Sequence, residues 1–499
     1  MEVRKDAFFK KMDDQGLALT FGDVRLRTDF SDIHPQAVIL KTKFSANISL
    51  NMPIVSSPMD TVTEAPMAIA MAKLGGLGII HRGLAPKDQA SMVGKVKFHL
   101  NALIKAPICV SLNDTVNAVM RLRKAKGYSF HSFPVLDGEG KLVGIVTKND
   151  FDFASSADQT IGEIMSKDLI TAPAGSSIND AYKLMLKNGK KILPLVSHGR
   201  LRGIYTFSDV KRILAGNSVG YSLDKNGGLL VGAAIGVGED AKERLCLLSE
   251  ERVDVVVIDT AHGFSQAVID TIRYAKKNYP EIDVVAGNIS EGMAASILAA
   301  AGVDGLRVGQ GPGSSCLTRV ITGVGRPQVS AVYDCAKALR GMNIPVCADG
   351  GIQNSDDIAI ALAAGADNVM LGNLLAGTEE SPGEIIRVKG MPYKRYRGMG
   401  SLEAMKEQRS SRQRYGQSED QEKLVPEGVQ GLVPDKGPLA HTIHQLTGGL
   451  RSSLGYLGTK DIYTFQKEAD FFRITNVGLQ ESHPHHIFYA DEAPNYKGH

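Results

Sequence analysis

Eight short apolar runs, most of them followed by a segment with helical apolar spacing, constrain the fold of this chain more than any other feature. Nearly every run ends in Asp, Asn, His or Gly, and the runs occupy residues 52–60, 77–81, 229–233, 253–259, 283–288, 305–309, 345–349 and 368–372. Strands buried on both faces read as continuous apolar runs, and eight strand–helix units close into a barrel. The sequence therefore predicts an α/β fold, a (β/α)8 TIM barrel. A doubly wound open sheet is the alternative, but no Gly-x-Gly-x-x-Gly opens a helix after a strand, so a Rossmann cofactor domain is not supported.

An internal repeat interrupts this alternation after the second unit. Residues 133–150 return as residues 193–209, sixty positions later (133 to 193), and a helix-patterned segment precedes each copy. One copy cannot bury both of its faces alone, so the two halves are expected to pack on each other as a pseudo-symmetric insert. The predicted organisation is a first barrel part over residues 1–106, the insert over 107–215, and a second barrel part over 216–499.

The insert resembles a tandem cystathionine-β-synthase (CBS) pair. In that family the Thr-x-x-Asp at the end of each half often contacts the ribose of an adenine nucleotide. The resemblance therefore implies a regulatory purine nucleotide at two pairs of residues, Thr147 with Asp150 and Thr206 with Asp209. The alternative is that both aspartates only cap helices, as Asp does readily.

Composition narrows the partners and the compartment. The chain is 43% hydrophobic and 22% charged with a net charge of +3, which indicates a folded protein without the basic footprint of a nucleic-acid binder. Its five cysteines lack paired Cys-x-x-Cys spacing, which favours a reducing compartment over a disulfide or structural zinc framework. The N-terminus has no apolar signal core and no apolar run reaches membrane-spanning length, so we expect a cytoplasmic protein without a membrane partner.

The most distinctive loop is residues 308–318, Val-Gly-Gln-Gly-Pro-Gly-Ser-Ser-Cys-Leu-Thr, which follows the apolar run at 305–309. Three glycines around a proline exclude a helix or a regular strand. The loop would lie at the carboxyl end of a barrel strand, where barrel enzymes carry their chemistry. Turned backbone aims carbonyl groups at a hard cation, and a thiol can attack an electrophilic carbon. The alternative is that Cys316 is a small buried apolar residue.

The last two predicted strands end in Asp349-Gly350-Gly351 and Gly372-Asn373. Barrels commonly bind phosphate there through backbone amides, which need glycine for close approach. Asp349 cannot bind phosphate itself at neutral pH, so it is better matched to a pair of sugar hydroxyl groups. A phosphate and a diol together predict a nucleotide substrate.

A long polar segment, about 378–446, follows the eighth run and ends in a predicted helix at 439–446. Long loops in compact domains are usually functional lids, so we expect a mobile flap. The alternative is that its arginines form a solvated surface.

Taken together, these residues give the chain a resemblance to a known family over essentially its whole length. The CBS pair has its usual place in that family. The chain resembles the inosine-5′-monophosphate (IMP) dehydrogenase family. Six motifs occur in the family's order: Gly309-x-Gly-Pro-Gly-Ser-x-Cys316-x-Thr318, Asp349-Gly-Gly, Tyr396-Arg-Gly-Met-Gly-Ser401, Arg414-Tyr415, Val425-Pro-Glu-Gly428 and Glu481-Ser-His483. The resemblance implies that the Cys316 thiolate adds to purine C2 of IMP, that hydride passes to NAD, and that the covalent thioimidate is then hydrolysed to xanthosine monophosphate (XMP), the committed step of guanine nucleotide synthesis.

The resemblance also assigns residues to ligands. For IMP it implies Ser57, Met59, Arg307, Ser314, Asp349, Gly350, Gly351, Gly372, Asn373, Tyr396, Arg397, Gly398, Met399, Gly400 and Glu427. For NAD it implies Asp259, Asn288, Gly309, Gln310 and Gly311 at the nicotinamide riboside, with His262 and, from a neighbouring subunit, Tyr456 at the adenine.

The same resemblance gives the flap a role in hydrolysis. Once the reduced cofactor leaves, Arg414 and Tyr415 are expected to enter the vacated pocket, where neutral Arg414 takes a proton from water. Thr318 and Glu427 offer a second proton route. Carbonyl groups of Gly311, Gly313 and Cys316, with Glu481, Ser482 and His483 from the C-terminal tail of an adjacent chain, are implied to bind potassium. A cation shared between chains implies a homotetramer, and an octamer stays open.

Three positions depart from the family pattern. Thr260 and Ala261 stand where the family commonly has two serines, and Asn373 stands where it commonly has serine.

Two rival functions are also considered. The first rival is a guanosine monophosphate (GMP) reductase, a sister enzyme that uses NADPH and lacks the Arg414-Tyr415 pair. The second is a nucleotide-sensing regulator whose barrel is degenerate, and an intact Cys316 argues against it.

Overall fold

The structure is a computed structural model that describes residues 4–99, 103–104, 107–126, 130–214, 220–418 and 420–484. Its contacts divide the chain into two compact units: Met1–His99 joined with Gly220–His499, and Leu100–Val219. No helix in the described ranges is long and apolar enough to cross a membrane.

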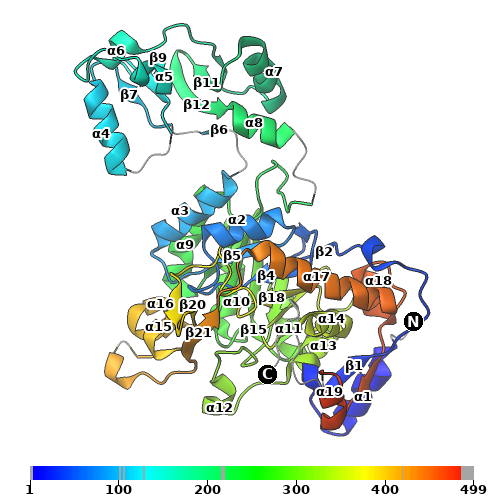
Figure 1. Ribbon diagram of the computed structural model, residues 1–499. Helices are drawn as coiled ribbons and strands as arrows, with labels where there is room; N and C mark the ends of the chain where they lie inside the picture. The colour runs from blue at the N-terminus through cyan, green and yellow to red at the C-terminus, as the bar shows by residue number, and fades with distance from the viewer. Residues whose placement is uncertain are drawn as a thin grey trace. The chain divides into compact units, whose positions relative to one another are not determined.

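The first unit is built on a closed barrel of parallel strands (Figure 1). Its strands, in order around the barrel, are β4 (Ile54–Ser56), β5 (Leu77–Ile80), β13 (Gly232–Ile235), β14 (Val255–Asp259), β15 (Asp283–Ile289), β16 (Gly305–Val308), β17 (Val346–Asp349) and β18 (Asn368–Leu371). These strands correspond one by one to the eight apolar runs, and their order around the barrel is their order in the chain. The predicted TIM barrel is therefore confirmed, and the open-sheet alternative is excluded.

The barrel interior is filled by apolar side chains of successive strands. Val55, Leu77, Val257 and Val285 belong to one buried cluster, to which Phe44 also belongs. The surrounding helices are α2 (Ala65–Lys73), α3 (Pro86–Lys97), α9 (Gly238–Glu250), α10 (Gln266–Asn278), α11 (Gly292–Ala300), α13 (Gln328–Ala338), α14 (Ser355–Ala364) and α17 (Leu439–Tyr456). Because both faces of each strand are covered, the strands need apolar residues at consecutive positions, which explains why the runs do not alternate.

The polar segment between β18 and α17 carries secondary structure of its own. It holds an antiparallel sheet, β19 (Ile386–Val388), β20 (Met391–Arg397) and β21 (Gln430–Pro434), and two short helices, α15 (Leu402–Glu407) and α16 (Arg409–Arg414). A 3-10 turn, η3 (Gln421–Lys423), follows them. The helix expected at 439–446 is the first part of the longer α17. The flap is therefore a folded excursion inserted between the eighth strand and its helix.

The chain ends pack beside the barrel. Strand β1 (Val24–Leu26) pairs antiparallel with β22 (Phe471–Arg473). The remaining elements of this unit are α1 (Lys5–Asp14), η1 (Phe21–Asp23), η2 (Pro35–Ala37), β2 (Thr42–Lys43), β3 (Ser49–Leu50), α12 (Thr318–Thr322), α18 (Ile462–Glu468) and α19 (Asn476–Glu481). Phe9 of α1 stacks on Tyr333 of α13 with ring centroids 3.8 Å apart, which fixes the N-terminal helix against the barrel wall.

The second unit contains two sheets that follow the sequence repeat. The first has the order β7 (Val110–Ser111), β8 (Phe133–Leu136), β9 (Leu142–Val146), and the second has the order β10 (Ala172–Pro173), β11 (Ile192–Ser197), β12 (Arg200–Thr206), β6 (Leu103–Ile104). The helices are α4 (Val116–Lys126), α5 (Lys148–Asp152), α6 (Ile161–Ile164), α7 (Ile178–Asn188) and α8 (Phe207–Leu214). The repeated residues form equivalent antiparallel pairs, β8 with β9 and β11 with β12, and each half has its own apolar cluster.

Candidate active site

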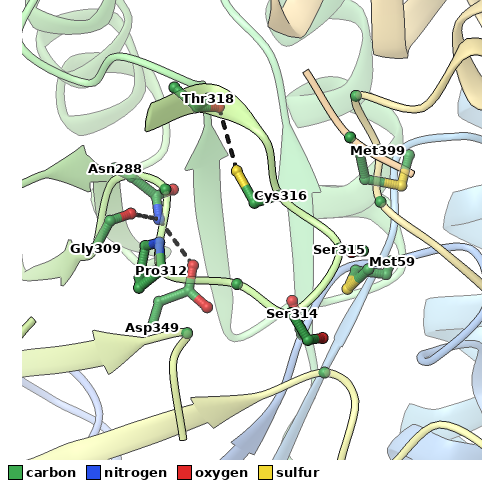
Figure 2. Close-up of a pocket in the computed structure, with 18 of the residues that line it drawn as sticks. Met59, Asn288, Gly309, Pro312, Ser314, Ser315, Cys316, Thr318, Asp349 and Met399 are labelled. Carbon is green, nitrogen blue, oxygen red and sulfur yellow. Dashed lines mark hydrogen bonds between the residues drawn. The ribbon is translucent and has the colours of Figure 1, made fainter. Parts of the chain in front are cut away.

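A pocket of about 200 Å³ lies at the carboxyl ends of the barrel strands (Figure 2). It is lined by Ser57, Met59, Thr260, Ala261, Asn288, Arg307, residues 309–316, Thr318, residues 349–353, residues 370–373, Tyr396, residues 398–400, Arg414, Tyr415, Glu427 and Gly428. These residues come from the barrel strands, the cysteine loop (residues 308–318) and the folded flap segment. The structure thus brings most of the expected IMP residues and the flap residues Arg414, Tyr415 and Glu427 into one cavity.

Cys316 sits in this pocket, half-buried, after a turn in which its backbone N–H donates to the Gly313 carbonyl at 3.0 Å. Its Sγ lies 3.2 Å from the Thr318 hydroxyl, and Figure 2 shows the two side chains facing each other. The next residue, Leu317, donates its N–H to the Glu427 carbonyl at 2.7 Å. The thiol is therefore reachable from the pocket, with a hydroxyl as neighbour, and does not belong to the apolar core.

Two glycines at the start of the cysteine loop have backbone angles that favour glycine: Gly309 has φ of +150° and Gly311 has φ of +79°. A Cβ on Gly309 would lie 2.0 Å from the Asp349 carbonyl oxygen, which is backbone and cannot move aside cheaply. The loop can therefore pass this close to the end of β17 only because residue 309 has no side chain.

Replacing Gly309 with alanine is expected to reduce stability by roughly 2–5 kcal/mol, through backbone strain and overpacking. It should also move Cys316 relative to Asp349 and so abolish most activity. Denaturant unfolding and a turnover assay measure both effects. The matched control is Gly323→Ala, because Gly323 has φ of +72° but nothing within 4 Å of the added atom. Strain alone should then cost about 1 kcal/mol. Equal losses in the two variants would contradict the close-approach argument.

One residue that the sequence analysis missed connects the cysteine loop to the end of β17. Gln328, the first residue of α13, is buried and donates its amide to the Val308 carbonyl at 2.8 Å and the Asp349 carbonyl at 3.1 Å. It thereby links the ends of β16 and β17. No motif pointed to Gln328, because its role depends on which two carbonyl groups lie near the start of α13 in the folded chain.

A polar network holds Asp349 beside the cysteine loop. Asn288 donates from its Nδ2 to the Asp349 carboxylate at 2.8 Å and to the Gly309 carbonyl at 2.7 Å, as Figure 2 shows. Arg307, only 1% exposed, donates to Asn288 Oδ1 at 2.8 Å and lies 3.2 Å from the same Asp349 oxygen. Asp349 is thus fixed by two neighbours and still has a surface toward the pocket, as a residue that accepts hydrogen bonds from sugar hydroxyls requires.

Asp259, at the end of β14, lies under the flap and not on the pocket wall. Its side chain, 3% exposed, forms ion pairs with Arg307 and with Arg414 of α16. Burial by itself would raise the pKa of this carboxyl group, but the nearby cations Arg414, Arg307 and Arg82 outweigh burial and lower the pKa. Asp259 is therefore a carboxylate held ionised, and in this conformation Arg414 covers it.

Arg414 and Tyr415 are half-buried beside the pocket, and Arg414 pairs with this carboxylate. The Arg414 guanidinium carbon is 5.8 Å from the centre of the Tyr415 ring, and that ring packs against Gly400, where an added Cβ would meet it at 2.8 Å. Burial lowers the pKa of Arg414, yet Asp259 more than offsets this and the pKa is raised. Burial raises the pKa of Tyr415 to about 12. The prediction that the flap enters the pocket fits this arrangement, and the solvated-surface alternative is wrong for this pair.

The other expected nucleotide residues surround the open part of the pocket. Ser314 donates to the Tyr396 hydroxyl at 3.3 Å, and Met59 lies 3.9 Å from that hydroxyl through its sulfur. Gly350 and Gly351 have φ of +89° and +82°, so backbone rather than side chains borders the cavity at the end of β17. Of the fifteen residues expected at IMP, Arg397 alone does not line the pocket. Its side chain is instead paired with Asp60 and Glu407, so the structure does not bring Arg397 to the pocket with the other expected residues.

Only some of the residues expected at NAD line the pocket. Asn288, Gly309, Gln310 and Gly311 line the pocket, whereas Asp259, His262 and Tyr456 do not. His262 contacts Gln310 through Nδ1 at 3.2 Å, and Tyr456 of α17 is 65% exposed.

The expected potassium ligands lie in two places. Gly311, Gly313 and Cys316 are in the loop, and Glu481, Ser482 and His483 are at the end of α19. His483 lines a second cavity together with Pro312 and Gly351. Within the described residues no group of three or more His, Cys, Asp or Glu side chains is arranged to hold a metal ion.

Comparison with known proteins identifies the family. A sequence model described as "IMP dehydrogenase / GMP reductase domain" matches residues 18–485. The chain belongs to this family. The inosine-5′-monophosphate dehydrogenase of Aquifex aeolicus (strain VF5) is 48% identical over 483 residues, covering 96% of this chain and 97% of that protein. The corresponding protein of Bacillus subtilis (strain 168) is 45% identical, with the same coverage of this chain and 97% of its own.

Among solved structures of the family, a GMP reductase from Trypanosoma brucei is also similar. Its structure is a cysteine-to-alanine variant in complex with guanosine 5′-monophosphate, with a TM-score of 0.85 and 38% identity over 94% of this chain and 98% of that one. The names dehydrogenase and reductase both denote oxidoreductases. The chain is accordingly an oxidoreductase.

Proposed function

We propose that the protein is an NAD-dependent IMP dehydrogenase that works through a covalent Cys316 thioimidate. The observation that supports this most is the meeting of a reachable thiol with a docked Arg414-Tyr415 pair in one pocket. A thiol is needed to activate purine C2, and a second group is needed to bring water to the adduct. The identity to named IMP dehydrogenases over nearly the whole chain supports the same conclusion.

In the first half of the proposed reaction, Cys316 Sγ forms a bond to C2 of IMP as the C2 hydride leaves. NAD, when bound, supplies the acceptor for that hydride. Asp349 would accept hydrogen bonds from the ribose hydroxyls, and the glycine backbone at 350–351 and 372 would bind the phosphate. Arg307, fixed by Asn288 and Asp259, would position the purine side of the pocket. The thiol donates a hydrogen bond to the Thr318 hydroxyl, 3.2 Å from Sγ, which would relay the thiol proton to water as the thiolate forms.

The nicotinamide riboside site fits the residues present. Asn288 and the backbone at 309–311 border the pocket, and Thr260 and Ala261 line it as well. Asp259 would offer its carboxylate to ribose hydroxyls, but Arg414 occupies that carboxylate here. A docked flap and a bound cofactor therefore compete for the same carboxylate, which separates hydride transfer from hydrolysis in time. Thr260 and Ala261, in place of the usual serines, give one hydroxyl group fewer.

In the second half, water attacks C2 of the thioimidate, the C–S bond breaks, and XMP and the thiol are released. Arg414 would accept the water proton, with Tyr415 as its partner, and Thr318 and Glu427 would supply the second route. An arginine accepts a proton only when it is neutral, and the ion pair with Asp259 favours the charged form. The proton-accepting state therefore differs from the conformation described here, in that the Arg414–Asp259 contact must be broken.

The decisive experiment mixes the purified protein with IMP and NAD and follows NADH absorbance. We expect NADH and XMP in equal amounts and, in protein quenched during turnover, an IMP-sized mass on the peptide containing Cys316. The alternative function, GMP reductase, is favoured by the similarity to the Trypanosoma brucei structure. NADPH consumption with GMP, together with no NADH from IMP, would establish that alternative.

We extend the proposal to potassium and to assembly. Backbone carbonyls suit a hard monovalent cation, and the Gly313 carbonyl, which accepts one hydrogen bond from Cys316, keeps a second lone pair for it. Gly311, Gly313 and Cys316 would form one half of the site, and Glu481, Ser482 and His483 of an adjacent subunit would form the other. Potassium would order the cysteine loop. A site divided between chains requires an oligomer, and the resemblance to the family makes a homotetramer the assembly we propose.

The second unit would bind a regulatory purine nucleotide at its two Thr-x-x-Asp sequences. In the first, both the N–H and the hydroxyl of Thr147 donate to Asp150 Oδ2, at 2.6 and 2.7 Å, which is the capping arrangement of α5. Capping uses one carboxylate oxygen, so the other stays available to a ribose. In the second, the side chain of Asp209 lies outside the described residues.

A further inference from the structure

The carboxylate of Asp60 connects three segments that surround the pocket. Its Oδ2 accepts hydrogen bonds from Arg397 Nε at 2.9 Å, Arg397 Nη2 at 2.5 Å and Gln408 Nε2 at 2.6 Å. The Asp60 and Arg397 side chains are only 8% and 9% exposed. The other oxygen, Oδ1, is buried and has no hydrogen-bond partner among the described residues. Three donors on one oxygen, away from water, make a strong and directional contact.

The three segments have distinct positions in the proposed reaction. Asp60 directly follows Met59 on the substrate loop, residues 57–60, which borders the pocket. Arg397 ends β20 and directly precedes the pocket residues 398–400. Gln408 is the joint between α15 and α16, and it serves as C-cap of the first helix and N-cap of the second. The far end of α16 carries Arg414, so Asp60 holds the near end of the helix that delivers Arg414 to Asp259.

The Gln408 side chain has contacts through its amide oxygen as well as through its amide nitrogen. Its Oε1 lies against Gly83, where an added Cβ would be 2.5 Å away, and it accepts a hydrogen bond from Ser411 at 3.3 Å. When Gln408 leaves, Asp60 loses one donor of three and keeps its ion pair with Arg397. No isolated charge is then left buried, so the contact can open and close at small cost.

We propose that Asp60 is a positioning residue that couples the substrate loop to the flap, with Gln408 docking on its carboxylate each time the flap closes. This inference rests on the proposed function. The Asp60–Arg397 ion pair is the permanent part, and the Gln408 hydrogen bond is the part that forms and breaks. Movement of residues 57–60 around a bound nucleotide would then shift Gln408 and, with it, the N-terminal end of α16.

The test uses Gln408→Ala in the full-length protein. A hydrogen bond to a charged group contributes enough to change the docked population about tenfold or more. We expect the first turnover of NADH formation, which needs the flap undocked, to change less than twofold. The steady-state rate should fall about tenfold, and the Cys316 adduct should accumulate. Gln408→Glu should be slower still, because it places a second carboxylate beside Asp60.

Two variants on the same helices serve as controls. Glu407→Ala removes the 62% exposed partner of Arg397 and should leave both rates unchanged. Gln413→Ala changes an exposed side chain of α16 and should also have no effect. A merely structural role for Gln408 would lower the first turnover and the steady state together, and that result would overturn the inference. So would unchanged rates in both Gln408 variants.

A second measurement does not depend on the reaction. Hydrogen exchange of residues 402–415 should be protected in the wild-type protein, further protected by IMP, and about tenfold less protected in Gln408→Ala. If the wild type forms no NADH, the proposed function fails, but the exchange result still decides whether Asp60 holds the flap. Equal protection in wild type and Gln408→Ala would refute the coupling even in an active enzyme.

Discussion

Replacing Cys316 with alanine is expected to abolish NADH formation from IMP and NAD, with a loss of about four orders of magnitude or more in turnover. Removal of a covalent nucleophile typically has effects of this size, because no neighbouring group can form the same bond. The Thr318 hydroxyl, although 3.2 Å from the sulfur, is far less nucleophilic than a thiolate at neutral pH. A coupled absorbance assay and intact-mass analysis measure the loss of turnover and of the adduct.

The Cys316 result needs proof that the variant is folded and still binds substrate. Thermal unfolding in the presence of IMP should show the same stabilisation as in the wild type. Cys246→Ala is the matched control, because Cys246 is an exposed thiol on α9, away from the pocket residues. Turnover that survives in Cys316→Ala, or that falls equally in Cys246→Ala, would rule out the thioimidate.

Replacing Arg414 with glutamine should leave hydride transfer intact and slow hydrolysis of the covalent adduct. We expect the first turnover of NADH formation to persist, because hydride transfer in the proposed reaction does not use the flap. Steady-state turnover should fall about 10²- to 10⁴-fold, which is the range for loss of an acid–base group. Nearly all the enzyme should then carry the covalent adduct. Rapid-quench kinetics and mass spectrometry of quenched samples follow the two halves separately.

Arg414→Lys distinguishes charge from chemistry at this position. Lysine keeps the cation that pairs with Asp259 but lacks the planar guanidinium that stacks near Tyr415. A variant that docks the flap yet hydrolyses slowly would show that pairing with Asp259 is insufficient. If Arg414→Gln instead loses the first turnover, Arg414 acts before hydrolysis and the assigned division of labour is wrong.

Much of this architecture could be predicted from the order of residues along the chain. Consecutive apolar residues indicated strands buried on both faces, and small or polar residues at their ends indicated the edge where the pocket lies. The glycines before Cys316 indicated a shaped loop, and a Cβ added to Gly309 would indeed lie only 2.0 Å from the Asp349 carbonyl oxygen. Such features are readable because periodicity and glycine permissiveness act within a few residues.

The pairings that complete the site depend on the closed barrel. Arg414 meets Asp259 across 155 positions of sequence, and Arg397 meets Asp60 across 337. Arg397 was therefore expected at the nucleotide, since its motif neighbours line the pocket, and only the folded structure shows that it turns toward Asp60. Gln328 gave no signal for the same reason. A local pattern determines which face a side chain occupies, whereas the partner on that face is decided by how distant segments are brought together when the strands close.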